Sequence, residues 1–312
     1  MLLFLPLPLE LVLHTIHCLL PSGSTSIHHP SSPITKALLS FTLVCHETRR
    51  VALKLLRQHC VHLSPGERLR SFLLAIPTCP DLRTTSSLFL APYNTPTIDD
   101  QPTAIWIREL FYFSNTHLRR LVMDMPLRSL IPENDHLDVR HILQAGFASL
   151  ENLEEFVSVQ DDLFLEPEVN GHGFPTWRHW PKLKHLALYQ AKTDFIFWWS
   201  VARMPMPERL VLTRAVIEIE NVKTILFEHA DMAARRRLEI KFIGNNKEYN
   251  LSAMGAQLTW EEDIYPEEKI EMRGYKWRSE GGCGTSGACR VAVGEWAQLG
   301  KLWNINGLKP QH

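Results

Sequence analysis

The glycine-rich segment "GCGTSG", residues 282–287, is one of the few places where this sequence could support chemistry. Its glycine spacing matches the turn that brings backbone amides close to the pyrophosphate of a dinucleotide. Such a turn follows a strand and precedes an acidic residue by about 20 positions. Here "YKWRSEG" precedes the segment, and Gly307 stands where the acid is needed. We therefore interpret the segment as a flexible loop and expect no cofactor.

The cysteines and histidines do not form a recognisable set of metal ligands. Cys283 and Cys289 lack a second Cys or His pair at zinc-finger spacing, and His28 with His29 lies in a polar stretch. We expect unpaired thiols and solvated imidazoles. The 6 cysteines are too few and too scattered in a chain of 312 residues to predict a disulfide framework, which favours a reducing compartment.

The clusters of charged residues are equally weak as catalytic or nucleic-acid sites. Asp161 and Asp162, like the acidic stretch 261–268, could serve as acid and base, but adjacent carboxylates without a nucleophile are typical of a solvated face. Arg235–Arg237 is one short basic run in a chain of net charge −1, which does not predict a nucleic-acid partner. The sequence thus predicts no active site of its own.

The apolar N-terminus is compatible with a secretory signal, a membrane segment or a folded module. It contains Pro6, Pro8 and Glu10, and the first Lys or Arg is Lys36, which disfavours a secretory signal; cleavage at the following "PSGSTS" is the alternative. The run is also shorter than the roughly 20 apolar residues that cross a bilayer. We therefore expect an intracellular protein, in the cytoplasm or the nucleus, without a membrane partner.

A short amphipathic helix explains the N-terminus better. Pro8 suits a helix start, and Glu10 lies in the first turn, where a carboxylate favours the helix dipole. Apolar residues then recur on one face, at Leu9, Val12, Leu13, Ile16, Leu19 and Leu20. A polar insert at 22–33 follows, which we expect to be flexible with nothing to pack. "ALLSFTLVC" and "TRRVALKLLRQH" predict two more helices, so three helices lie within about 60 residues.

These three segments resemble a fungal-type F-box. The matching residues are Leu7, Pro8, Glu10, Leu11, Ile16 and Leu19, and, in the second half, Leu43, Val44, Cys45, Arg49 and Leu53. The insert at 22–33 lengthens the first loop, and Thr48 stands where the family usually has a large apolar residue. The resemblance implies that this face binds the Skp-type adaptor of a cullin-RING ubiquitin ligase. The alternative is that the apolar stripe packs against the rest of the chain.

The larger part of the chain carries a repeated leucine pattern. Short apolar segments centre on Leu88, Leu121, Phe156, Leu186, Leu210 and Leu238, with separations of 33, 35, 30, 24 and 28 residues. Regular leucine-rich repeats span about 20 to 29 residues, so these are long and uneven. The Leu-x-x-Leu-x-Leu spacing nevertheless places apolar side chains on one face of a short strand, as a stack of parallel strands requires.

This region also resembles the divergent repeats that follow the F-box in such fungal proteins, on "RLRSFLLAIPTCPDL", "WRHWPKLKHLALYQAKTDFIFW" and "MPERLVLTRA". The expected fold class is therefore α+β or α/β, with an F-box-like three-helix module at 6–62. An irregular leucine-rich-repeat-like α/β solenoid follows at 64–275, and a Gly-rich tail at 276–312 is left without a predicted structure. The tryptophan cluster of Trp177, Trp180, Trp198 and Trp199, with Phe195 and Phe197, is expected to be mostly core; the alternative is an exposed binding surface for a protein partner.

Taken from the resemblance, the expected function is that of a substrate-recognition subunit of a Skp-cullin-F-box ubiquitin ligase. The chain would bind the adaptor through its N-terminal helices and a protein substrate through the repeats, and the chemistry would reside in partner subunits. The alternative is a non-catalytic structural or regulatory protein that keeps the F-box-like module without promoting ubiquitination. A hydrolase is a remoter alternative, for which the sequence offers no nucleophile motif.

Overall fold

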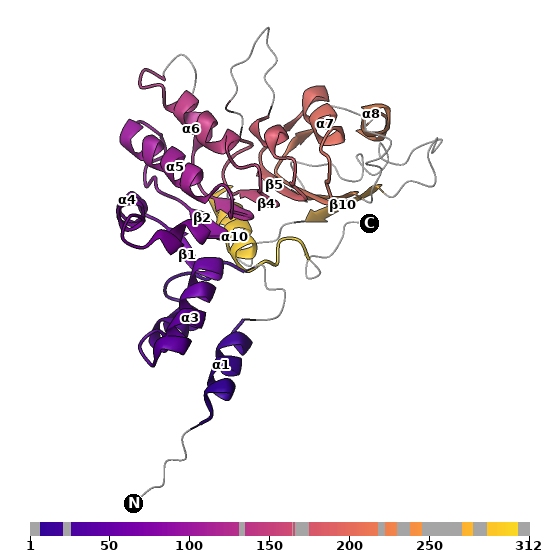
Figure 1. Cartoon of the computed structure of the whole chain (residues 1–312). Coiled ribbons are helices and arrows are strands. Elements are labelled where there is room, and N and C mark those ends of the chain that lie inside the picture. The colour runs from indigo at the N-terminus through magenta and orange to yellow at the C-terminus, as the bar shows by residue number, and fades with distance from the viewer. Residues whose placement is uncertain are drawn as a thin grey trace, which may run out of the picture.

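The chain folds as a mixed α/β protein around an open sheet of parallel strands (Figure 1). The computed structural model describes residues 7–20, 26–130, 135–163, 165, 175–217, 222–229, 238–244, 270–276 and 286–304. The α/β class expected from the sequence is confirmed. In Figure 1 the N-terminal helices extend from the edge of the sheet that holds its first strand.

Three helices near the N-terminus share a small apolar core of their own. They are α1 (Leu9–Cys18), α2 (Pro33–Phe41) and α3 (His46–His59). The buried members of this core are Ile16, Leu20, Leu38, Ala52 and Leu55. The apolar stripe predicted from Leu9 to Leu20 therefore has its central part, around Ile16, covered by α2 and α3.

Within the described residues, the main sheet contains eight parallel strands that lie side by side in chain order, and a separate two-stranded ribbon accompanies it. The strands are β1 (Val61–Leu63), β2 (Ser87–Leu90), β3 (Arg120–Met123), β4 (Glu155–Ser158), β5 (His185–Tyr189), β7 (Arg209–Thr213), β9 (Leu238–Gly244) and β10 (Ile270–Lys276). The separate ribbon pairs β6 (Lys192–Thr193) with β8 (Val216–Ile217). Each connection thus leads to the neighbouring strand, as in a stack of repeated units.

The strand register confirms the leucine pattern at all but its last position. Leu88, Leu121, Phe156, Leu186 and Leu210 stand opposite one another in successive pairs. The ladder continues to Ile240 rather than to Leu238, which pairs with Ile270. Residues 238 and 240 point to the same face because side chains alternate along a strand. All these leucines lie in one core, as expected.

Helices cover one face of the sheet and enclose the main core. They are α4 (Gly66–Ala75), α5 (Gln101–Ser114), α6 (Val139–Ala148), α7 (Phe195–Ala202) and α8 (Val222–His229), with short 3-10 turns at Pro80–Thr84, Leu127–Ser129 and Thr176–His179. Asp100 and Asp194 cap α5 and α7 by accepting hydrogen bonds from backbone amides. Gly146 lets α6 approach α5 closely, since a Cβ there would stand 3.0 Å from Arg108 Cα.

The tryptophan cluster belongs mostly to this core. Trp177, Trp180 and Trp198 are buried, and the indole of Trp180 donates a hydrogen bond of 2.8 Å to the Phe147 carbonyl. Phe197 is buried beside them, whereas Phe195 is half exposed. The expectation that the cluster is core rather than a partner surface is therefore confirmed for most of its members.

The opposite face of the sheet is covered by two segments that are distant in sequence. Helix α10 (Ser286–Gln298), with Leu302 and Trp303 after it, packs on strand residues that include Phe89, Val122, Val157 and Tyr189. Ile27 joins the same core from the N-terminal side and donates a 2.6 Å backbone hydrogen bond to the Gln298 carbonyl. Part of the predicted C-terminal tail is thus an ordered helix.

The polar insert at 22–33 is anchored, contrary to the expectation of a segment with nothing to pack. Residues 21–25 lie outside the described part of the chain, but Ile27 is 1 % exposed. The backbone amide of His28 donates a hydrogen bond to the His59 carbonyl at the end of α3, and the Thr35 hydroxyl donates one to the His29 carbonyl. Ile27, the single apolar residue in this polar segment, fixes the segment because its side chain enters a core whose other members come from residues 89–303.

Candidate functional site

An exposed apolar surface lies at the end of the three-helix module that is far from the sheet. Leu43 and Val44, in the turn between α2 and α3, are 85 % and 63 % exposed, and Leu7 and Leu11 at the start of α1 are more than half exposed. Helix α3 ends two residues before β1, so its first residue and the preceding turn point away from the sheet. The N-terminal end of α1 also points away from the sheet in Figure 1. We call these residues the module tip.

Most residues that the F-box resemblance assigned to adaptor binding are accessible. The exposed ones are Leu7, Pro8, Glu10, Leu11, Leu43, Val44, Cys45 and Arg49, and Leu19 is partly buried. Ile16 differs, because it is 0 % exposed in the core between α1, α2 and α3. Its role in this structure is to hold the helices together. Only a rearrangement of the module would bring it to a surface.

Two exposed leucines extend the module tip beyond the residues predicted from sequence. Leu39 is half exposed on α2, one helical turn before Leu43, and Leu9 is 40 % exposed at the start of α1. The sequence placed Leu9 on the apolar stripe, but it gave no reason to distinguish the part of the stripe that is buried from the part that is exposed. Leu39 could have been found from its spacing to Leu43, since residues four apart lie on the same side of a helix.

Thr48 serves as a helix cap, which accounts for its departure from the F-box pattern. Its hydroxyl accepts a hydrogen bond from the Cys45 amide at 3.1 Å, which satisfies that backbone donor, and donates one to the Cys45 carbonyl at 3.0 Å. Thr48 is buried, and its hydrogen bond to Cys45 lowers the pKa of that exposed thiol. A large apolar side chain at this position could not form these hydrogen bonds, so it would remove the cap.

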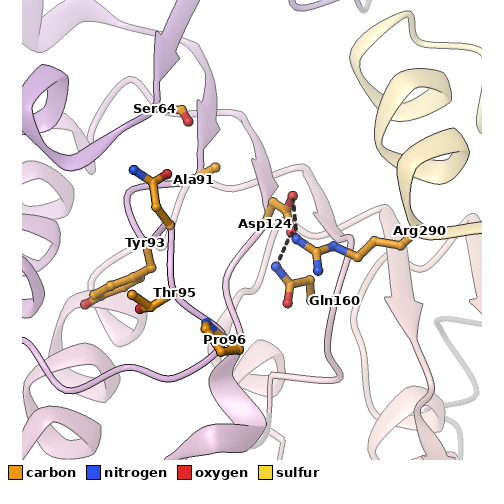
Figure 2. Close-up of a pocket in the computed structure, with 9 residues that line it drawn as sticks. Ser64, Ala91, Tyr93, Thr95, Pro96, Asp124, Gln160 and Arg290 are labelled. Carbon is orange, nitrogen blue, oxygen red and sulfur yellow. Dashed lines mark hydrogen bonds and ion pairs between the residues drawn. The ribbon is translucent and has the colours of Figure 1, made fainter. Parts of the chain in front are cut away.

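A polar cavity lies at the carboxyl ends of β1 to β4. Its volume is about 430 Å³, and its lining includes Ser64, Tyr93 and Gln160, which follow three of these strands. Figure 2 shows Asp124, which follows β3, between Gln160 and Arg290 of α10. The Asp124 carboxylate forms an ion pair with Arg290 at 3.0 Å and accepts a hydrogen bond from the Gln160 amide. The one carboxylate and the one guanidinium in this lining thus satisfy each other.

A second cavity of about 430 Å³ borders the other side of the Asp124–Arg290 ion pair. Its lining is more apolar, with Phe89 and Val159 from the sheet and Val291 and Gly294 from α10. Asp124 and Arg290 line both cavities, so the ion pair is their common wall.

Asp161 is buried, so the expectation of a solvated acidic face is wrong for this residue. Its carboxylate accepts a 2.6 Å hydrogen bond from the Arg128 amide and pairs with the Arg128 guanidinium at 3.0 Å, while Asp162 pairs with the same side chain at 3.1 Å. Burial, together with the negative charge of Asp162, raises the pKa of Asp161 to about 7. The arrangement fastens the loop after β4 to the turn after β3. The acidic stretch 261–268 lies outside the described residues.

The histidines expected to be solvated lie at the joint between the three-helix module and the sheet. The His28 ring forms a hydrogen bond of 2.9 Å with Ser26, and the His29 ring stands against the ring of His62 at 4.7 Å. His62 in turn stacks on Phe89 of β2 at 4.2 Å. Burial lowers the pKa of His62 to about 4, so this imidazole is neutral in the fold. His28 and His62 are partly buried and contribute packing, whereas His29 is exposed, so the expectation of a solvated imidazole is wrong for His28 but confirmed for His29.

A complete set of metal ligands and a membrane-spanning helix are both lacking from the described part of the chain. Among the described residues, no group of three His, Cys, Asp or Glu side chains is placed to hold a metal ion. Within the same ranges, no helix is long and apolar enough to cross a membrane. Cys283 and Arg235–Arg237 lie outside these ranges. The chain matches no protein-family model, and neither curated proteins nor solved structures include a match to it.

Proposed function

We propose that the chain is the substrate-recognition subunit of a Skp-cullin-F-box ubiquitin ligase, acting in the cytoplasm or nucleus. The observation that carries this proposal is the module tip, where Leu7, Leu11, Leu43 and Val44 are exposed on a small helical module. These are positions that the F-box resemblance assigns to the adaptor. Burial of such side chains against a partner would stabilise a complex, because each contributes about 1.5 to 3 kcal/mol when fully removed from water.

The second support is the way in which the rest of the chain is built. Parallel strands in chain order, with the main helices on one face and α10 on the other, form a stack whose outer surface grows by one strand per unit. A surface of this kind suits recognition of a protein partner. In the proposal, ubiquitin transfer takes place on partner subunits, and this chain supplies proximity between them and the substrate.

The test is binding of the full chain to a purified Skp-type adaptor. We expect Leu43→Asp/Val44→Asp to weaken binding at least about 100-fold, since two apolar contacts are replaced by charges that must be desolvated. Leu74→Asp is the matched control, because Leu74 is 68 % exposed on α4, outside the module. Ile16→Lys is a poor test, since a charge in the helical core would unfold the module whether or not an adaptor binds there.

Equal binding of the wild-type chain and the double variant would refute the adaptor proposal. If the adaptor binds as expected, reconstitution with the cullin-RING ligase should produce ubiquitin transfer. Adaptor binding without transfer would instead support a regulatory or structural protein with an F-box-like module.

A further inference from the structure

His14 and Cys18 form an exposed pair of metal-ligating side chains on α1. They are four residues apart, so they lie one above the other on the same side of the helix. At about 100° per residue, each lies about 160° around the helix from Ile16, whose side chain is buried between the three helices. The pair therefore stands on the side of α1 that faces away from the core of the module.

The two ligand atoms already have the separation that zinc requires. His14 Nε2 and Cys18 Sγ are 3.5 Å apart and share a hydrogen bond. In a tetrahedral site with a Zn–S distance of about 2.3 Å and a Zn–N distance of about 2.1 Å, two such atoms are about 3.6 Å apart. Zinc can thus take the place of the shared proton with little movement of either side chain.

One copy of the chain supplies only part of a zinc site. Structural zinc is almost always held by four ligands, and two Cys with two His is one of the common sets. Among the described residues, no three His, Cys, Asp or Glu side chains converge on one point. The ligands that His14 and Cys18 lack must therefore come from another molecule.

A second copy of the chain supplies the lacking ligands in the right chemical form. The two members of a two-fold dimer present the same patch to each other, so His14 and Cys18 of both copies make a set of two Cys and two His. Two thiolates and two neutral imidazoles balance the charge of Zn²⁺, and the two thiol protons pass to the solvent. Helix α1 contains no Lys or Arg that would repel the metal.

The surroundings of the pair also suit contact between two copies. Leu11 lies one helical turn before His14 on the same side of α1, and its side chain is 52 % exposed. Contact with the partner helix would remove this side chain from water, which favours association. Helix α1 lies at the end of the molecule opposite to α7 and α8 (Figure 1), where a second copy can approach it.

We propose that His14 and Cys18 are one half of a tetrahedral zinc site, which two copies of the chain complete by pairing their α1 helices. Zinc in this site is structural, because four protein ligands leave no open position for a substrate. The inference does not rest on the proposed function, and neither ligand is among the residues that the F-box resemblance assigns to the adaptor.

Sedimentation of the purified full chain, with and without zinc chloride, tests the proposal. A phosphine reductant is present throughout, so that a disulfide between two copies of Cys18 cannot produce the dimer. We expect a monomer after treatment with a chelator, and a dimer that holds one zinc ion per two chains after zinc is added. Cobalt chloride in place of zinc should give the visible absorption of a tetrahedral site and a charge-transfer band from thiolate.

Two variants remove the proposed ligands, and two matched variants leave them in place. Cys18→Ser and His14→Ala should each weaken zinc-dependent dimerisation at least about 100-fold, since even the outer-shell partners of a metal contribute about 10- to 100-fold. His17→Ala on the same helix and Cys79→Ser at another exposed thiol should dimerise like the wild-type chain. All four side chains are exposed, so none of the variants removes a core contact.

The stoichiometry and the variants together decide the outcome. The proposal is overturned if the wild-type chain does not bind zinc, if it binds one zinc ion per monomer, or if it dimerises equally in the presence of chelator. It is also overturned if the zinc-dependent dimer survives Cys18→Ser or His14→Ala, or if the cobalt spectrum lacks the thiolate band. Failure of adaptor binding would leave all of these measurements unaffected.

Discussion

Leu186 lies near the centre of the ladder that joins the strands, and its truncation tests whether the strands form one cooperative unit. The side chain is 1 % exposed and stands between Phe156 on β4 and Leu210 on β7. Leu186→Ala leaves a cavity that neighbouring strands cannot easily fill, and such substitutions cost about 2 to 5 kcal/mol. We expect a loss of about 3 kcal/mol in the free energy of unfolding.

Urea unfolding followed by tryptophan fluorescence measures this loss, because the buried Trp177, Trp180 and Trp198 report on the core directly. With a slope of about 3 kcal/mol per M, the midpoint should fall by about 1 M. Far-UV circular dichroism should give the same midpoint if the strands unfold together. Leu186→Asp, which buries an unpaired charge, should leave the sheet unfolded in buffer.

Leu74→Ala is the control, because it is the same substitution at a side chain that is 68 % exposed. Its midpoint should stay close to that of the wild-type chain. The reasoning fails if Leu186→Ala leaves the midpoint unchanged. It also fails if fluorescence and circular dichroism separate into distinct transitions, since the strands would then be independent.

Three further predictions concern polar contacts. Thr48→Val removes the cap of α3 and should destabilise the helical module by about 1 kcal/mol, measured by urea unfolding. The folded-state pKa of Asp161 is raised to about 7, so ionisation of this carboxyl lowers the stability of the protein as pH rises from 5 to 7. Asp161→Asn removes this loss and should make stability rise more steeply with pH over that range. His62→Phe should have the opposite effect on the slope, since the folded-state pKa of His62 is lowered to about 4 and its contribution is lost as pH falls below the unfolded value. Midpoints at pH 5, 6 and 7 test both signs, and a variant slope equal to that of the wild-type chain would contradict the corresponding assignment.

The main core was predictable from sequence because its signal is local. Each strand carries inward residues two positions apart, so the pattern around Leu121 or Leu186 identifies both the strand and its buried side. The prediction is wrong at Leu238 because β9 has seven residues, which allow more than one register with the same inward face. The three-residue strand β1 is too short to give such a pattern.

The second face was not predictable because its parts have no strong periodicity of their own. Helix α10 packs through Cys289, Val293 and Ala297, and small residues of this kind do not produce an apolar stripe that stands out from its surroundings. Ile27 is a single apolar residue in a polar segment. Its burial depends on α10, whose residues lie more than 250 positions away in the sequence.

The candidate adaptor site shows a different limit of sequence patterns. A periodic stripe identifies the apolar face of α1, but it does not distinguish the part covered by the chain itself from the part left for a partner. Ile16 and Leu9 both belong to the predicted stripe, yet Ile16 is fully buried and Leu9 is 40 % exposed. The distinction depends on where α2 and α3 cross α1, which is a property of tertiary packing.

The joint between the two cores determines which experiments can separate their functions. Ile27 and His28 connect the end of α10 to the end of α3 through consecutive backbone hydrogen bonds, and His62 of β1 stacks on Phe89 of β2. A truncated chain that begins near Ser64 would therefore lack the edge strand β1 and part of the second core, as well as the helical module. Loss of partner binding in such a deletion would not identify the surface responsible. Point substitutions at the module tip leave this joint intact, so they can assign adaptor binding to that surface of the folded chain.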